Sequence, residues 1–534
     1  MNAEDRTTPE TVDVVVIGAG MGGLTAAALL ARAGQRVCVL ERDTRPGGYL
    51  AGFERGKFVF DSAIHWLNAC GPDGSVRRVL DFLGPDAPET PPLRIIRRYQ
   101  GDSFNYLLTD RPDVLRDQLI ADHPEQRQGI TDFFAAAKII GQVFVDMTDH
   151  LRSSETRGLL ERASAGMAMG KVTLPFLKYV RWSTEDAFAK LFPAPALLRM
   201  FASEERLLSC LTPIGWAYTG DFQIPPAGGS REFPRFLVRC IEADGGTVLM
   251  RHGVTRVLVE DGRAVGVVTQ RGKKGAEQEV RAKYVLAAGD LEALYERMLP
   301  PGAVPPALIK KVAEAELYES SVTVSLGLDV PPEDIGFGEE LVQLTRDDVP
   351  RGEQVDTDPH KAAISVIAPS LRDPTLAPPG KGTITILTMA NIAWADGWKT
   401  GEGYQRGSDY KALKKEYADV LIDRVVAAIS PTLREHIEVL DVATPVTHWR
   451  YTGNRDGSIM AARPSRANFR NKVAHYQTPV KNLLLAGQWA ELGGGVPVAV
   501  RAGTNAALIV LRREKSPAFE GIAAMVDGKA TGGA

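Results

Sequence analysis

The chain has few cysteines, no long apolar run and almost no net charge, and each shortage excludes a class of protein. Its four cysteines, Cys38, Cys70, Cys210 and Cys240, form no CxxC or CxxxxC pair. This spacing argues against a zinc site, and we expect no metal; it also argues against a disulfide-reductase flavoenzyme. Cys38 lies within a predicted buried strand and is most simply a small core residue. Such cysteine usage fits a reducing cytosol.

Two further absences concern membranes and nucleic acid. No run reaches the ~18 apolar residues of a membrane-spanning helix, and the polar N-terminus, MNAEDRTTPE, is not typical of a secretory signal. The net charge of −3 gives no reason to expect nucleic acid as a partner. We therefore expect a cytoplasmic protein. Its 534 residues are enough for two or three domains.

A glycine-rich pattern is present at residues 12–41, VDVVVIGAGMGGLTAAALLARAGQRVCVLE. The apolar run Val12 to Ile17 predicts a strand, and Gly18, Gly20 and Gly23 follow it with G-x-G-x-x-G spacing. In such a turn the first glycine permits the bend and the second lets the backbone approach a pyrophosphate. The third lets the following helix pack closely on the strand. The N-terminus of that helix offers free N–H groups to the phosphates.

An acidic residue completes this pattern. The helix stops at Gly34, and a second strand, Arg36 to Leu40, runs into Glu41, 23 positions after Gly18. A carboxylate at this position can bind both hydroxyls of an adenosine ribose. Strand, turn, helix, strand and acid occur in the required order, so the sequence predicts dinucleotide binding.

A second glycine turn indicates which dinucleotide is bound. Gly47 and Gly48 follow Glu41 closely, before a short alternating strand, Phe58 to Phe60. A nicotinamide dehydrogenase would instead run into another helix–strand repeat of the same sheet. A second backbone-rich approach to the ligand is typical of FAD enzymes.

The C-terminal part holds a third glycine-rich segment, NLLLAGQWAELGGGVPVAVRAGTNAA at 482–507. A short buried strand, Leu483 to Ala486, meets Gly487, and Gly493 to Gly495 open a helix at Val496 and Pro497. The positive end of this helix would point at whatever lies before it. A reduced flavin, which is negative around N1 and O2, suits that place.

With these segments the chain resembles the phytoene desaturase, carotenoid isomerase and retinol saturase group of FAD oxidoreductases, relatives of the amine oxidase flavoproteins. The resemblance rests on the GAGMGGL…LE…PGG block and on the segments at 225–267, 444–461 and 483–500. It implies that FAD is the cofactor. It also implies a set of FAD-binding residues: Gly18, Gly20, Met21, Gly22, Gly23, Glu41, Arg42, Gly47, Gly48, Val254 (through its backbone), Gly487, Gln488, Gly495, Val496 and Pro497. Many relatives have an acid where this chain has Gln488, which leaves that contact open.

The fold that follows is α/β: a discontinuous Rossmann-type FAD-binding domain, an inserted α+β substrate domain and a helical lid that could face a membrane. We assign residues 1–85, 225–300 and 475–512 to the FAD-binding domain, 86–224 to the helical lid, 301–474 to a substrate-binding sheet domain and 515–534 to a flexible tail. Within these parts, a helix is predicted from Phe133 to Met147, a hairpin over 247–268, and strands within 318–330, 361–368 and 382–393.

The insert indicates the character of the substrate. Residues 165–201 mix Met, Leu, Phe, Trp and Tyr with five basic residues. Such a surface could rest on a bilayer and admit a lipid, but helices of this composition also pack into cores. Peripheral membrane association therefore stays open. The basic residues are Lys171, Lys178, Arg181, Lys190 and Arg199.

The sequence offers fewer candidates for catalytic residues than for FAD-binding residues. His65, which follows the second glycine turn, could face the flavin or the substrate, although a structural histidine fits equally well. His448 and Tyr451, in the 444–461 segment, are further candidates. Hydride transfer at flavin N5 with an unactivated hydrocarbon need not require a protein base.

Three functions remain open. The first is an FAD enzyme that desaturates, saturates or isomerises a long apolar polyene or isoprenoid. The second is an amine-oxidase-like enzyme for a small amine, and the third a non-catalytic FAD-binding escort of prenyl lipids. We favour the first. No second nucleotide-binding pattern is visible, so an external electron acceptor or donor would exchange electrons with the flavin.

Overall fold

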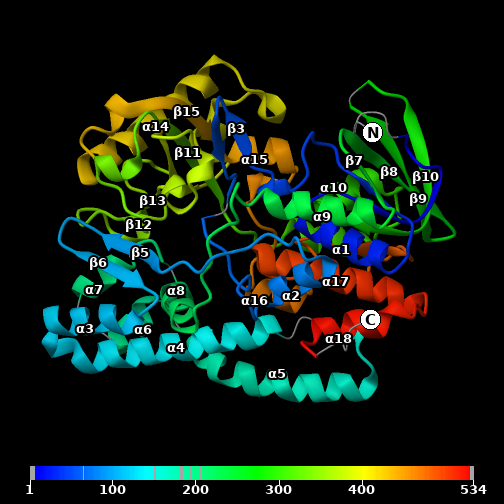
Figure 1. Ribbon diagram of the computed structural model, residues 1–534, viewed down its shortest axis with the longest axis horizontal. Coiled ribbons are helices and arrows are strands. Elements are labelled where there is room, and N and C mark those ends of the chain that lie inside the picture. Colours follow the sequence, from blue (N-terminus) through cyan, green and yellow to red (C-terminus); the bar gives the residue numbers. More distant parts are fainter. Residues whose placement is uncertain are drawn as a thin grey trace.

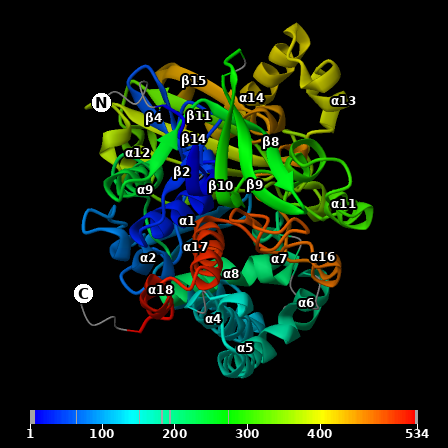
Figure 2. The same cartoon turned by 90° about the vertical axis from the view of Figure 1, so that its right-hand side faces the viewer.

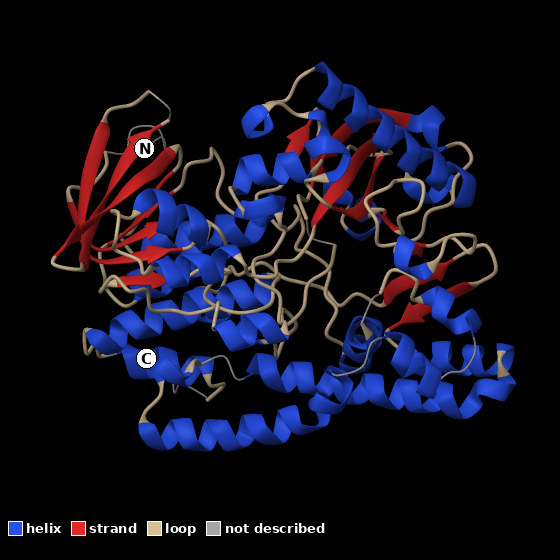
Figure 3. Cartoon of the chain, turned by 180° about the vertical axis from the view of Figure 1, so that it is seen from behind, coloured by secondary structure: helices blue, strands red, loops and turns tan. Residues whose placement is uncertain are grey.

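The computed structural model describes residues 7–63, 65–149, 152–180, 184–191, 195–204, 206–272 and 274–529. Two seven-stranded sheets lie on opposite sides of the molecule, and a layer of helices runs beneath them (Figure 1). Seen from behind, the strands form separate groups with loops between them (Figure 3). These observations confirm the predicted α/β class.

The first sheet contains the N-terminal unit predicted from the glycine pattern. β1 (Thr11–Ile17), α1 (Met21–Arg32) and β2 (Val37–Leu40) follow one another, and the two strands pair in parallel. Both strands are almost entirely buried, which explains their continuous apolar runs. The strand order is β7-β2-β1-β10-β9-β8, with β16 paired to β10. The remaining bounds are β7 (Thr247–Leu249), β8 (His252–Glu260), β9 (Arg263–Arg271), β10 (Glu277–Ala287) and β16 (Leu483–Leu485).

The hairpin predicted over residues 247–268 is placed differently. β7 pairs in parallel with β2, and the hairpin consists of β8 and β9 alone. Arg251 has a left-handed φ of +62°, which ends the extended run before His252. The chain therefore turns between β7 and β8.

Three long helices of this part pack together. α1 packs against α9 (Glu232–Ala243) and against α17 (Val496–Arg513), and α17 lies beside α1 in Figure 2. A Cβ atom added to Gly503 of α17 would overlap the carbonyl oxygen of Gly22. The absence of side chains at these two positions lets the backbones of α1 and α17 approach closely.

The second sheet has the order β15-β11-β14-β13-β12-β5-β6. One face, with Val322, Val324 and Ile386 among others, packs against α14 (Ser408–Ala428). The strands predicted within 318–330, 361–368 and 382–393 are all present. Their bounds and those of the other strands are β5 (Ile95–Gln100), β6 (Asn105–Thr109), β11 (Ser320–Leu328), β12 (Leu341–Leu344), β13 (Ile364–Ile367), β14 (Gly382–Ala390) and β15 (Ile437–Ala443). β3 (Phe53–Arg55) and β4 (Phe58–Phe60) form a separate pair.

The segment 86–224 contains more than the expected helices. β5 and β6 form a hairpin that extends the second sheet, because β5 pairs in parallel with β12, about 245 residues away. The following helices have their own core, and α4 and α8 are in close contact. The helices of this segment are α3 (Pro112–Asp122), α4 (Arg127–Asp149), α5 (Leu159–Val180), α6 (Thr184–Leu191), α7 (Pro195–Met200) and α8 (Leu207–Thr219).

The C-terminal region also differs from expectation. We expect a flexible tail from 515, but Ala518–Val526 forms α18. Ile522 and Val526 are buried, because α18 packs against α17 and α2 (Ser75–Leu83). The domain boundaries themselves stay a prediction. The other helices are α10 (Leu291–Ala293), α11 (Pro306–Ala313), α12 (Pro369–Arg372), α13 (Trp394–Lys399), α15 (Pro445–Thr452) and α16 (Arg466–Asn471).

Candidate functional site

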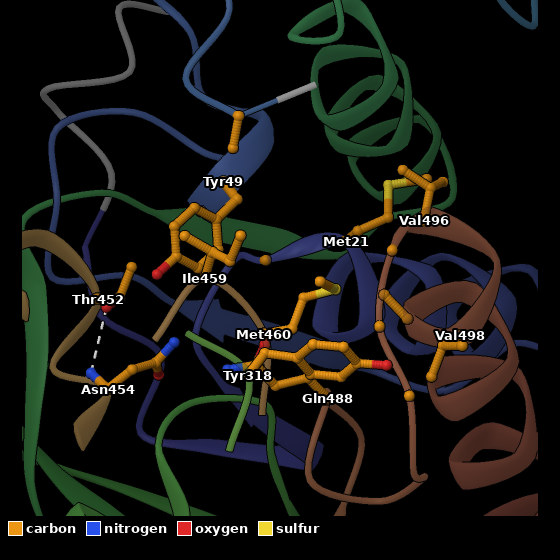
Figure 4. A pocket seen from close by; sticks show the side chains of 18 of the residues that line it. Met21, Tyr49, Tyr318, Thr452, Asn454, Ile459, Met460, Gln488, Val496 and Val498 are labelled. Carbon is orange, nitrogen blue, oxygen red and sulfur yellow. Dashed lines mark hydrogen bonds between the residues drawn. The ribbon is translucent and has the colours of Figure 1, made fainter. Parts of the chain in front are cut away.

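One cavity of about 2410 Å³ is lined by segments from the whole length of the chain. Figure 4 shows Tyr49 and Ile459 on one side of it, Met21, Val496 and Val498 on the other, and Met460 and Tyr318 between them. The cavity brings together nearly all predicted site residues: Gly18, Gly20, Met21, Gly22, Glu41, Arg42, Gly47, Gly48, His65, Val254, His448, Tyr451, Gly487, Gln488, Gly495, Val496 and Pro497.

Gly23 is the exception. A Cβ atom at this position would overlap the carbonyl oxygen of Gly18 and come within 3.2 Å of the Val16 side chain. Gly23 therefore serves the packing of α1 on β1 rather than the cavity wall. That is the role assigned to the third glycine of such a turn.

The two N-terminal glycine turns lie against each other. Gly47 donates its N–H to the carbonyl of Ala19 at 2.7 Å, and Gly20 and Gly47 form an isolated parallel bridge. Gly18 and Gly47 have φ values of +97° and +121°, which L-residues with a side chain rarely adopt. A Cβ atom on Gly20 would have no neighbour within 4 Å. The backbone at Gly20 is therefore open to a ligand in the cavity.

Glu41 is held at the end of β2 by backbone donors. One carboxylate oxygen accepts the N–H of Ala19 at 2.7 Å and the other accepts the N–H of Asp43 at 2.8 Å. These bonds fix the carboxylate beside the first glycine turn. The neighbouring Arg42 donates through Nη2 to the carbonyl of Tyr451 at 2.5 Å, which links β2 to the end of α15.

The C-terminal glycines complete the cavity wall opposite the two N-terminal glycine turns. Gly487 lies so close to Ala288 that a Cβ atom would meet the Ala288 backbone within 3 Å. Gly495, with a φ of +86°, precedes α17 as its N-cap, and no side chain caps this helix. α1 likewise begins after Gly20 without a side-chain cap. Two helix N-termini therefore offer backbone N–H groups to one cavity, an arrangement that suits an extended anionic ligand.

His448 is buried and His65 is partly buried. His448 Nε2 lies 3.1 Å from Ser321 Oγ, and its ring lies 5.9 Å from that of Tyr49. Burial lowers the pKa of His448 to about 4. Burial, with the charge of Arg372, also lowers the pKa of His65 to about 4. Both histidines are therefore neutral near pH 7.

The third candidate, Tyr451, differs from the two histidines. Tyr451 is 49% exposed, and the guanidinium of Arg450 lies 5.6 Å from its ring centroid. It therefore belongs to the rim of the cavity rather than to its interior.

Several cavity residues carry no sequence signal strong enough to predict them. Tyr49 follows the second glycine turn directly, and its hydroxyl donates to the carbonyl of Ser458 at 2.7 Å. Burial raises the pKa of this tyrosine. Tyr318 and Met460 also line the cavity. The Gly-Gly-Tyr sequence could have predicted Tyr49. Tyr318 and Met460, in contrast, reach the cavity only because segments far apart in the sequence pair with each other.

The cavity extends beyond the glycine segments into the helical layer. Apolar side chains of α4 and α8 line this part, including Phe144, Met147 and Trp216, and Tyr179 of α5 joins them. The side chains of Lys171, Lys178 and Lys190, and residue Arg181, fall outside the described residues, whereas Arg199 is exposed. No group of three or more potential metal ligands occurs among the residues that the structure describes. In the same part of the chain, no helix combines the length and apolar character that a membrane crossing needs.

Comparisons with known proteins agree with this geometry. A family model described as flavin containing amine oxidoreductase matches residues 21–511. An all-trans-retinol 13,14-reductase of Danio rerio is 28% identical, covering 96% of this chain and 88% of its own length. A prolycopene isomerase of an Oncidium hybrid is 25% identical, covering 84% and 75%. The crystal structure of an oxidoreductase from Methanosarcina mazei has the same fold, with a TM-score of 0.56 at 18% identity, covering 94% of this chain and 100% of that one. The resemblance to the carotenoid and retinoid group is thereby confirmed.

Proposed function

The chain belongs to the flavin containing amine oxidoreductase family, and we propose that it is an FAD-dependent oxidoreductase acting on carbon–carbon bonds of a long apolar polyene or isoprenoid. The observation that carries this proposal is the cavity, which runs from the glycine turns to the apolar side chains of α4 and α8. The names of the retinol reductase and the prolycopene isomerase support the same substrate class.

The residues present fit FAD. Glu41 would accept hydrogen bonds from the ribose hydroxyls, and the backbone at Gly20, Gly47 and Gly48 would face the pyrophosphate. The backbone of Val254 would hold the adenine, and the N-terminus of α17 would face the flavin ring. When bound, FAD supplies a hydride acceptor or donor at its N5 position. Reduction, desaturation and isomerisation all use that chemistry, with an external electron partner where needed.

The protein's own contribution is orientation and exclusion of water. Phe144, Met147 and Trp216 would hold an apolar chain against the flavin, which raises the fraction of productive encounters. His448, neutral and bonded to Ser321, would shape the wall beside Tyr49. We retain His65, His448 and Tyr451 as candidates for contacts with the substrate.

We also propose that α5 docks on a membrane surface. Leu160, Met167 and Leu174 follow one another at seven-residue spacing and are 88%, 69% and 68% exposed. This spacing places them on one side of the helix, and α5 lies along the outer edge of the molecule (Figure 1). A row of exposed apolar side chains on a peripheral helix suits the lipid–water boundary, from which an apolar substrate could enter.

The test is an anaerobic reaction followed through the flavin spectrum. The purified protein is expected to carry FAD, and a panel of carotenes, retinoids and other unsaturated lipids is mixed with the oxidised and with the dithionite-reduced protein. Bleaching by a polyene identifies desaturation, and reoxidation by a polyene identifies saturation. If only small amines reduce the flavin, an amine-oxidase function replaces the proposal. If no compound changes the spectrum and product analysis shows no isomerised polyene, an escort function replaces it.

A further inference from the structure

Tyr318 stands just before β11, where the second sheet meets the glycine segments of the cavity. Its N–H donates to the carbonyl of Ala461 at 3.2 Å, and its neighbour Leu317 forms an isolated antiparallel bridge with Ala462. The carbonyl of Ala462 in turn accepts the N–H of Gly493 at 3.1 Å. These backbone bonds connect Tyr318, which itself lines the cavity, to the glycines that precede α17.

The side chain of Tyr318 faces the space in front of α17. In Figure 4 its ring lies beside Met460, and its hydroxyl is directed toward the side of the cavity on which Val498 lies. Met460 packs on the glycines before α17, since a Cβ atom on Gly494 would overlap its sulfur atom. The hydroxyl of Tyr318 is therefore close to the place where the flavin ring would lie.

This hydroxyl keeps its proton and is free to contact a ligand. It forms no hydrogen bond with any residue that the structure describes. Burial and the charge of Glu319 raise the pKa of Tyr318, while Arg463 and Arg206 oppose this effect. Because the usual pKa of a tyrosine is already about 10, the phenol is protonated near pH 7 and can donate its hydrogen.

Other tyrosines and histidines of the cavity are less suited to give up a proton. The hydroxyl of Tyr49 donates to a backbone carbonyl, and that of Tyr476 donates to a glutamate. Burial lowers the pKa of His65 and of His448 to about 4. Near pH 7 neither histidine therefore carries the extra proton that a histidine acid donates.

Building on the proposed function, we propose that Tyr318 is a catalytic acid when the polyene is reduced: its hydroxyl donates a proton to one carbon of a double bond while the neighbouring carbon receives the hydride. The π bond, the O–H bond of Tyr318 and the N–H bond at flavin N5 break, and two C–H bonds form. The double bond gains the two electrons that the reduced flavin loses. The tyrosinate regains its proton from water, and an external reductant restores the reduced flavin.

The experiment separates reduction of carbon from other reactions of the reduced flavin. Wild type and Tyr318→Phe are reduced without air by stoichiometric dithionite. Reoxidation of the flavin is then followed after mixing with the polyenes of the panel above, all-trans-retinol and lycopene among them, or with benzoquinone. Tyr318→Phe should lower the rate with the polyene about 100-fold or more, a usual size for a general-acid contribution. The rate with benzoquinone should not change, because a quinone takes up no proton on carbon.

Two further measurements do not depend on turnover. Titration of the apoproteins, followed by flavin fluorescence, should give the same affinity for FAD with and without the Tyr318 hydroxyl. Ultraviolet difference titration of the two proteins should show that Tyr318 ionises above pH 10. Tyr404→Phe is the matched control, because the hydroxyl of Tyr404 also forms no hydrogen bond with a described residue and Tyr404 does not line the cavity; it should keep both rates.

Four results would overturn the role of Tyr318. They are an unchanged rate with the polyene in Tyr318→Phe, an equal loss of rate with benzoquinone, a weaker affinity of this variant for FAD, and ionisation of Tyr318 below neutral pH. If no polyene reoxidises the wild type, the reductive form of the proposed function fails as well. An unchanged rate in Tyr318→Phe, in contrast, leaves that function standing and removes only the role of Tyr318.

Discussion

Gly503 of α17 faces Gly22 of α1 so closely that a Cβ atom on Gly503 would overlap the Gly22 carbonyl oxygen. This contact joins the C-terminal glycine segment to the N-terminal one. It places the start of α17 and the start of α1 at the same cavity, so the shape of the proposed FAD site depends on the separation of these two helices.

Gly503→Ala should therefore destabilise the protein and reduce its flavin content. The added methyl group forces α1 and α17 apart, at a cost of about 1–3 kcal/mol. The midpoint of thermal unfolding and the ratio of flavin to protein absorbance measure both effects. Gly521→Ala is the matched control, since a Cβ atom there would have no neighbour within 4 Å. Equal flavin content in both variants would contradict the proposed dependence of the FAD site on the separation of α1 and α17.

Glu41→Gln should weaken FAD binding about 10- to 100-fold, because a charged acceptor for the ribose hydroxyls is lost. Titration of the apoprotein followed by flavin fluorescence measures the change. FMN, which lacks the adenosine, should bind both proteins equally. Glu260→Gln is the control, as Glu260 pairs with Arg281 on the surface and does not line the cavity. Parallel losses for FAD and FMN would exclude ribose recognition by Glu41.

Acid should destabilise the protein partly through His448. Its pKa is about 4 in the folded state against a usual value of 6.5. Between these values the unfolded chain binds a proton that the folded protein does not, so the free energy of unfolding falls as pH decreases from about 6.5 to about 4. The contribution is about 3 kcal/mol at most.

His448→Gln should flatten this pH dependence, which urea unfolding at several pH values measures. His360→Gln, at an exposed position, should leave the slope unchanged. A His448→Gln protein with the same slope as the wild type would show that His448 titrates normally when folded.

Replacing Leu160, Met167 and Leu174 of α5 by Gln should reduce binding to phospholipid vesicles about 10-fold or more, because burial of each apolar side chain in lipid contributes favourably. Co-sedimentation with vesicles measures the bound fraction. Val114→Gln/Ile139→Gln serves as the control, as these exposed residues lie on α3 and α4. Undiminished binding of the triple variant would remove α5 as the docking surface.

The sequence predicted those parts of the fold that are encoded locally. β1, α1 and β2 follow from consecutive residues, and Glu41 follows from its distance to Gly18. The hairpin β5–β6 was missed because its sheet partner, β12, lies about 245 residues away, and Arg97 and Arg98 interrupt the apolar pattern of the strand. α18 was missed because its burial depends on α2 and α17, and its own residues, AFEGIAAMV, resemble the small-residue tail around them.

The distinction between features encoded locally and features that depend on distant contacts also applies to the site. His65 was found by its place after the second glycine turn and His448 by its place in the 444–461 segment, but the contact of His448 with Ser321 depends on the packing of α15 on β11. Arg97 of β5 also lines the cavity, but the sequence gives no signal for it, because the partner strand β12 lies far away in the chain. Residues that contact a substrate through tertiary packing cannot be identified from periodicity alone.

The position of α17 and β16 near the end of the chain has a consequence for biosynthesis. Domains form from the N-terminus during translation, at roughly 5–20 residues per second, yet β16 completes the first sheet beside β10 and α17 closes on α1 only when residues 483–513 have emerged. A nascent polypeptide lacking them has the first glycine turn but no opposing wall. FAD should therefore bind only after residues 483–513 have emerged, and chains truncated before Gly487 should accumulate in the apo form.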